Sequence, residues 1–269
     1  DAGIEITTGP LGQGISNGVG MALALKKYCQ ENKLKRTPKV YIFCGDGCLM
    51  EGISQEAISL AGHLKLENLI LVYDNNKISI DGSTDLAFSD DTNLRFQSVN
   101  WNVLNGKGHD HKNINQLFKK AQNSKKPILM NFKTIIGFGS PNKSAKASSH
   151  GSPLGKDEIL LTKQKLKWNA KPFTIPSNLL SAWRKSANRN QKIYIQSKKS
   201  LKIKNSIKKF ENQMDKFFDI IASDFKSFDT PQATRKSSEG VLNYLHTSMP
   251  ILGGSADLTG SNNTKGKSM

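Results

Sequence analysis

Two short polar segments have the residue types of a site for a metal ion and a diphosphate. Gly45-Asp46-Gly47 follows one apolar run, and Asn76 follows the next. Asp46 offers a charged oxygen, Asn76 a neutral one, and a main-chain carbonyl just after Asn76 a third. Mg²⁺ prefers such oxygens and takes its other ligands from phosphates, while glycine lets a diphosphate approach the backbone closely. Either segment alone could be a tight turn; the pair favours a metal–diphosphate site.

These segments need a scaffold that brings them together. Short apolar runs predict buried parallel strands at 40–44, 69–73 and 128–135, and helical periodicity fills 15–31, 52–66 and 113–124. This alternation is typical of an α/β fold, a parallel sheet with helices on both faces. Ligands of such sheets bind beyond the carboxyl ends of the strands. The loops 45–51 and 74–82 both lie at that edge.

The pattern loosens after residue 155. We expect helices at 158–168, 177–188 and 232–246, and a strand-like 251–252. The stretch 184–216 is rich in lysine and carries most of the net charge of +17. With little arginine and few aromatic residues, it favours a solvated linker over nucleic-acid binding, and polyanion binding stays the alternative.

Composition excludes several other classes. Hydrophobic residues make up 36% and charged residues 23%, as in ordinary globular proteins, and no apolar run approaches the length of a membrane span. Three cysteines cannot build a disulfide scaffold, and no signal segment opens the chain, so we expect a cytoplasmic protein. Both ends are interpreted as cuts, which makes the chain a piece of a longer one.

The sequences of these motifs resemble those of one protein family. GDGCLMEGISQEA and YDNNKISIDG are similar to the thiamine diphosphate motif as it occurs in transketolases. Only about 170–232 carries no specific match, and within the matched region Gly260, Ala147 and Ser148 depart from residues common in the family. Other matching segments occur in the family's order: TTGPLGQG at 7–14, IGFGS at 136–140, SHGSPL at 149–154, ATRK at 233–236 and GGSADLT at 253–259.

The resemblance implies a cofactor site. Asp46, Asn76 and the carbonyl of Ile78 would hold Mg²⁺ (or Ca²⁺), and Gly47 would contact the diphosphate of thiamine diphosphate. Asn76 would therefore also be a cofactor-binding residue. The family's cofactor cavity would be lined by Gly9, Leu11 and Gln13.

Further roles follow from the same resemblance. Glu51, assigned a catalytic role, and Glu56, assigned to cofactor binding, would join a carboxylate network across a dimer interface, although both would suit the first turn of any helix. His150 would be catalytic and would contact substrate, because imidazole trades protons near neutral pH. The substrate phosphate would be bound by Arg235 and Ser261, and the partner subunit's cofactor would be reached by Asp257 and Leu258.

The implied protein is a homodimeric transketolase that moves a two-carbon ketol unit from a ketose phosphate to an aldose phosphate. Residues 1–205 would be a truncated thiamine diphosphate-binding domain with the Lys-rich arm, and 206–269 the beginning of a pyrimidine-binding domain. The chain alone should show little or no turnover, because the glutamate that activates the cofactor would lie beyond it. Partners would be sugar phosphates, with no nucleic acid and no membrane. The alternatives are a dihydroxyacetone or deoxyxylulose synthase, and a non-enzymatic basic binding module.

Overall fold

The computed structural model describes residues 3–34, 36–188, 231–248, 251–255 and 257–266, with isolated residues between 191 and 223. The chain divides into two compact units, Asp1–Lys171 and Pro172–Met269. Most of the Lys-rich arm and the predicted boundary between 205 and 206 lie outside the described residues. That boundary stays a prediction.

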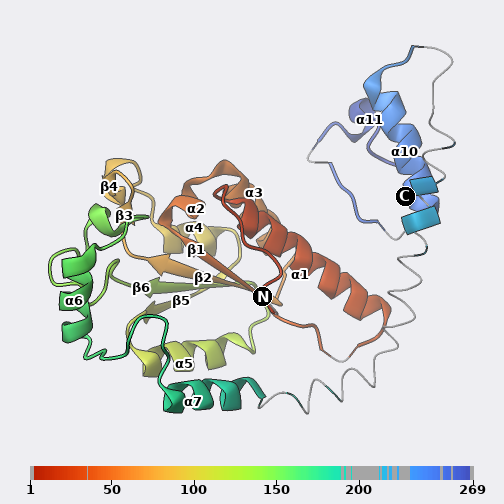
Figure 1. Ribbon diagram of the computed structural model, residues 1–269. Helices are drawn as coiled ribbons and strands as arrows, with labels where there is room; N and C mark the ends of the chain where they lie inside the picture. Colours follow the sequence, from red (N-terminus) through yellow and green to blue (C-terminus); the bar gives the residue numbers. More distant parts are fainter. Residues whose placement is uncertain are drawn as a thin grey trace. The chain divides into compact units, whose positions relative to one another are not determined.

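The first unit is built around a parallel four-stranded sheet (Figure 1). Its order is β1-β2-β6-β5, and every neighbouring pair runs parallel. Three strands lie where the apolar runs predict them, and β5 is an additional edge strand. The bounds are Val40–Gly45 for β1, Leu69–Asn75 for β2, Asn102–Lys107 for β5 and Ile128–Lys133 for β6.

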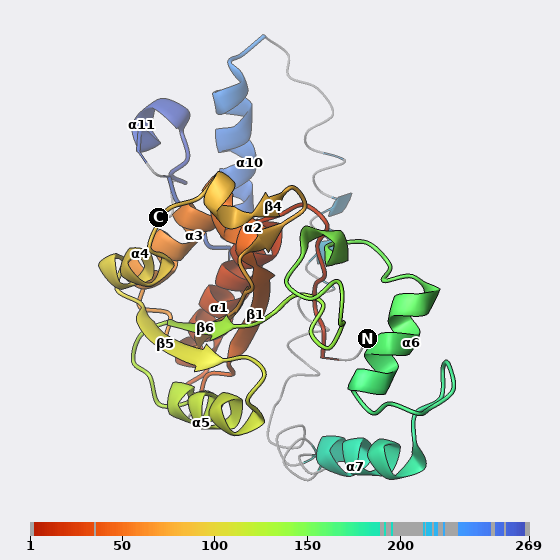
Figure 2. The same ribbon diagram turned by 90° about the vertical axis from the view of Figure 1, so that its left-hand side faces the viewer.

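Helices lie on both faces of this sheet, which confirms the predicted fold class (Figure 2). One face is covered by α1 (Gln13–Glu31), α3 (Gly52–His63) and α4 (Thr92–Ser98), and the other by α5 (His111–Ala121). The helix expected at 52–66 ends at His63 and is preceded by a separate short helix, α2 (Asp46–Met50). The α5 helix begins earlier than predicted because Asp110 caps it, accepting hydrogen bonds from the N–H groups of Lys112 and Asn113.

Smaller elements complete the two units. The first unit adds the β3–β4 hairpin (Ile78–Ser79 and Gly82–Ser83), 3-10 turns at Thr84–Leu86 and Ala147–Ser149, and α6 (Lys156–Lys165). The second contains α7 (Ser177–Asn188), α10 (Thr234–Ser248) and α11 (Thr259–Asn262). The strand-like expectation at 251–252 is wrong, because these residues form no regular element.

Strand alternation divides the core into two clusters. Ile42, Leu71 and Leu129 are buried against α1 and α3, whereas Val72 and Met130 are buried on the α5 face. Because the side-chain period of a strand is two, neighbouring residues supply opposite faces.

The helical cover is incomplete over β1. On the α5 side, Phe43 is 74% exposed and Tyr41 is 41% exposed, because α5 packs over the middle of the sheet. Within the described residues, no helix has both the length and the apolar character that crossing a membrane requires.

Candidate functional site

The ends of β1 and β2 bring the two polar segments into direct contact. The register pairs Gly45 with Asp74, so Asp46 and Asn76 follow adjacent strand ends. Asp46 is only 7% exposed. Its Oδ2 accepts hydrogen bonds from the backbone N–H groups of Asn76, at 3.3 Å, and Lys77, at 3.2 Å. The carboxylate therefore ties the two loops together at the carboxyl edge of the sheet.

A third contact comes from Tyr73, which the sequence indicated only as a core residue. Its hydroxyl donates to Asp46 Oδ1 at 2.5 Å, and the ring is 3% exposed. Burial, followed by the hydrogen bond to Asp46, raises the pKa of Tyr73 well above its ordinary value. The phenol therefore keeps its proton and acts as a donor. Only the strand register, which places Cys44 beside Tyr73, could have signalled this pairing.

The oxygen donors at this edge fit a divalent cation. Asp46 supplies one carboxylate, and the amide oxygen of half-buried Asn76 accepts the Ile78 N–H at 3.0 Å. Across the described residues, no group of three or more His, Cys, Asp or Glu is placed to hold a metal. One carboxylate with neutral oxygens matches a hard cation that takes further ligands from a diphosphate. Asp46, Asn76 and the Ile78 carbonyl would hold that ion.

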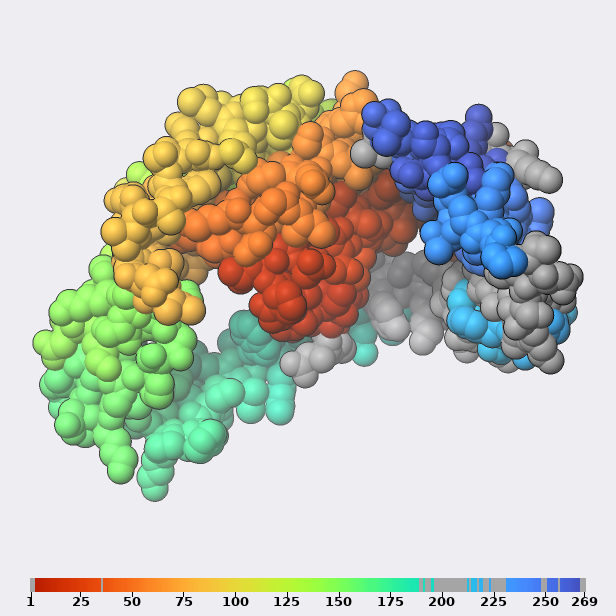
Figure 3. All heavy atoms as spheres, turned by 90° about the horizontal axis from the view of Figure 1, so that it is seen from above, coloured from red at the N-terminus to blue at the C-terminus, as the bar shows by residue number. Residues whose placement is uncertain are grey.

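The glycine-rich segment before α1 packs against the Gly45–Gly47 loop. Gly12 has φ +81°, and a Cβ added there would lie 2.9 Å from side-chain atoms of Glu51, Ile53 and Ser54. A Cβ added to Gly47 would meet the Leu11 side chain at 3.2 Å. The start of α1 and the α2–α3 region lie side by side in the space-filling view (red and orange in Figure 3). The fold thus brings Leu11 to the predicted diphosphate contact, Gly47.

The other residues predicted for this edge are exposed. Gly9 and Gln13 lie on the surface around the start of α1, and Glu51 and Glu56 lie on the surface at the start of α3.

Burial raises the pKa of the Cys44 thiol. Because the thiolate is the nucleophilic form, this shift does not favour a nucleophilic role for Cys44.

His150 lies at the end of the long loop that follows β6. The loop folds on itself: Ser149 Oγ donates to the Lys143 carbonyl at 2.5 Å, and the His150 N–H donates to the Ala147 carbonyl at 2.8 Å. The ring nitrogen Nδ1 is shielded from solvent and has no hydrogen-bond partner among the described residues. The residue as a whole is half-buried.

Two anchors that the sequence did not reveal hold this loop. Glu158 is 8% exposed and accepts hydrogen bonds from Ser140 Oγ, the Asn142 N–H at 2.8 Å and Asn142 Nδ2 at 2.9 Å. These bonds, Ser140 first, lower the pKa of Glu158 to about 2. Exposed His109 accepts the Ile135 N–H at 2.9 Å and stacks on Phe138.

Four predicted residues belong to the second unit. Arg235 is exposed in the first turn of α10, and Asp257, Leu258 and Ser261 are exposed at α11. The Asp46 site belongs to the first unit. Their roles stay predictions.

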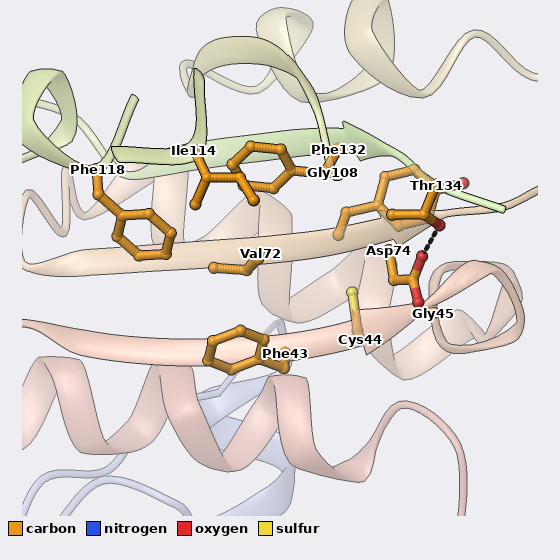
Figure 4. Close-up of a pocket in the computed structure, with 11 residues that line it drawn as sticks. Phe43, Cys44, Gly45, Val72, Asp74, Gly108, Ile114, Phe118, Phe132 and Thr134 are labelled. Atoms are coloured by element: carbon orange, nitrogen blue, oxygen red, sulfur yellow. Dashed lines mark hydrogen bonds between the residues drawn. The ribbon is translucent and has the colours of Figure 1, made fainter. Parts of the chain in front are cut away.

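A separate apolar pocket of about 460 Å³ lies on the α5 face of the sheet (Figure 4). Phe43, Val72 and Phe132 line it from the strands, and α5 contributes two apolar side chains. At its polar end, Thr134 donates to Asp74. Tyr73 points its hydroxyl to Asp46 and packs in the cluster on the opposite face.

Comparison with known proteins agrees with this geometry. Residues 1–225 match the family model described as transketolase, thiamine diphosphate binding domain. The chain is similar to a transketolase of Rhodobacter capsulatus, with 42% identity over 98% of this chain and 41% of the relative.

Solved structures show the same likeness. A transketolase from Campylobacter jejuni superposes with TM-score 0.86 and 39% identity, over 99% of this chain and 43% of that chain. One from Pichia stipitis, in complex with sedoheptulose-7-phosphate, superposes with TM-score 0.82 and 39% identity, over 98% of this chain and 42% of that chain.

Fold and site together define a thiamine diphosphate-binding α/β module. This chain belongs to the transketolase family. It spans about two fifths of the length of the relatives it matches.

Proposed function

We propose that this chain provides the diphosphate- and metal-binding part of a transketolase. The activity would be transfer of a two-carbon ketol unit from a ketose phosphate to an aldose phosphate. Bound thiamine diphosphate supplies the carbanion chemistry, and the protein supplies binding and orientation. The observation that carries the proposal is the direct bonding of the Asp46 and Asn76 loops at the carboxyl edge of the sheet.

Each residue at this edge has a defined task in the proposal. Asp46, Asn76 and the Ile78 carbonyl hold Mg²⁺. Gly47 leaves room for the diphosphate, because a Cβ there would crowd Leu11. The Leu11 side chain, half exposed beside that glycine, would line the cofactor cavity.

His150 acts on the substrate in this proposal. The imidazole of this half-buried residue would accept a proton from a donor-sugar hydroxyl. Glu158 holds the part of the same loop around Ser140 and Asn142.

The remaining parts of the proposal rest on the family. Glu51 and Glu56, exposed at the start of α3, would face a second subunit in a homodimer. Gly9 and Gln13 would line the cofactor cavity, Asp257 and Leu258 would reach the partner's cofactor, and Arg235 and Ser261 would bind the sugar phosphate. The pentose phosphate pathway and a cytoplasmic location belong to the same proposal.

Calorimetric titration of the purified chain with thiamine diphosphate tests the proposal. We expect binding in Mg²⁺ that disappears with a chelator, because Asp46 would hold the metal ion and the ion would in turn supply charge for the diphosphate. An Asp46→Ala variant should lose binding, whereas Asp85→Ala should keep it, since Asp85 is an exposed carboxylate of the nearby 3-10 turn at Thr84–Leu86. An affinity for thiamine diphosphate that changes neither with the chelator nor with Asp46→Ala would refute the metal–diphosphate site.

A further inference from the structure

We infer that Tyr73 is a positioning residue for the metal-binding carboxylate of Asp46. The inference rests on the proposed function, since it assigns Tyr73 a task at the same site. Two observations carry it: the 2.5 Å hydrogen bond from the Tyr73 hydroxyl to Asp46 Oδ1, and the burial of both side chains.

The hydroxyl comes from a rigid part of the molecule. Tyr73 lies on β2, a central strand with β1 on one side and β6 on the other. Its ring is 3% exposed and packs in the cluster beneath α1 and α3. Asp46, in contrast, begins a helix of only five residues. The sheet therefore fixes the donor, and the donor fixes the carboxylate.

The three donors to Asp46 differ in strength. The phenol bond at 2.5 Å is in the range of a charge-assisted O–H to carboxylate bond. The two backbone N–H groups reach Oδ2 at 3.2 and 3.3 Å, the long end of the usual range. The Tyr73 hydroxyl is thus the main restraint on the carboxylate's rotation. It occupies one lone pair of Oδ1 and leaves the other for a cation, whereas Oδ2 already accepts two hydrogen bonds.

Partners that hold a metal ligand in place typically contribute a factor of about 10 to 100 in metal affinity. Tyr73→Phe removes only the hydroxyl and keeps the buried ring. The concentrations of bound and free Mn²⁺ in each protein sample are measured by electron paramagnetic resonance in the presence of thiamine diphosphate. The expected result is a dissociation constant for Mn²⁺ raised about 10-fold or more over wild type.

Tyr41→Phe is the matched control. Tyr41 lies on the adjacent strand β1, and its hydroxyl accepts a hydrogen bond from Gln122 at 3.0 Å, away from Asp46. This control should bind Mn²⁺ as wild type does. Unfolding midpoints without metal separate packing from positioning: a structural role would lower the midpoint of Tyr73→Phe and leave the affinity of the folded fraction unchanged.

The outcomes are distinguishable. Wild-type Mn²⁺ affinity in folded Tyr73→Phe overturns the positioning role and leaves the proposed function standing. A wild-type chain that takes up no Mn²⁺ with thiamine diphosphate overturns both. A loss of Mn²⁺ affinity in Tyr73→Phe, with the affinity of Tyr41→Phe unchanged, supports the inference.

Discussion

Replacing Gly12 with alanine should destabilise the first unit through two separate effects. Its φ of +81° is a left-handed conformation, which costs an L-residue roughly 1–2 kcal/mol. The added Cβ would also lie 2.9 Å from atoms of Glu51, Ile53 and Ser54, and such overpacking costs roughly 1–3 kcal/mol. The free energy of unfolding should therefore fall by about 2–5 kcal/mol.

Gly20→Ala, in the same helix α1, is the internal control. No atom lies within 4 Å of its added Cβ, and its φ is outside the left-handed region, so the substitution should raise the free energy of unfolding by roughly 0.5–1 kcal/mol. Urea unfolding followed by circular dichroism measures both variants. If Gly12→Ala unfolds at the same urea concentration as Gly20→Ala, the result contradicts the close packing of the glycine-rich segment against α3.

Three further predictions concern the core and the His150 loop. Leu129→Ala, at a fully buried position of β6, should lower the free energy of unfolding measured in urea by about 2–5 kcal/mol. A smaller decrease would contradict the burial of Leu129 in the core. Glu158→Gln should speed amide hydrogen exchange at Asn142, whose N–H donates to Glu158, and unchanged exchange would contradict its anchoring role. The folded pKa of Glu158, about 2, lies below that of an unfolded glutamate, about 4.3. Its contribution is therefore present above the unfolded pKa and is lost as pH falls toward 2, so the gap in thermal midpoint between wild type and Glu158→Gln should close between about pH 5 and pH 2.

The strands that position the site were predictable because their local signals are strong. The runs beginning at Val40, Leu69 and Ile128 are almost wholly apolar and end in glycine or polar residues. The edge strand β5 was missed, since only Val103 and Leu104 in it are apolar. Its other residues are polar or glycine, so the segment has no apolar run that would indicate a strand.

The main contacts of the site depended on long-range register. Asp46 and Asn76 were predictable as a pair because parallel strands end at one edge. The hydrogen bond from Tyr73 to Asp46 was not predictable, since a tyrosine in an apolar run is equally typical of a core residue. Glu158 was predicted only as the start of a helix, and its burial depends on a loop whose path leaves no periodic signal.

Anomalous diffraction from crystals grown with Mn²⁺ and thiamine diphosphate would test the central claim most directly. The account predicts a manganese peak at coordination distance from the side-chain oxygens of Asp46 and Asn76 and the carbonyl of Ile78, with the diphosphate beside Gly47. A peak elsewhere, or a diphosphate bound away from the carboxyl ends of β1 and β2, would contradict it.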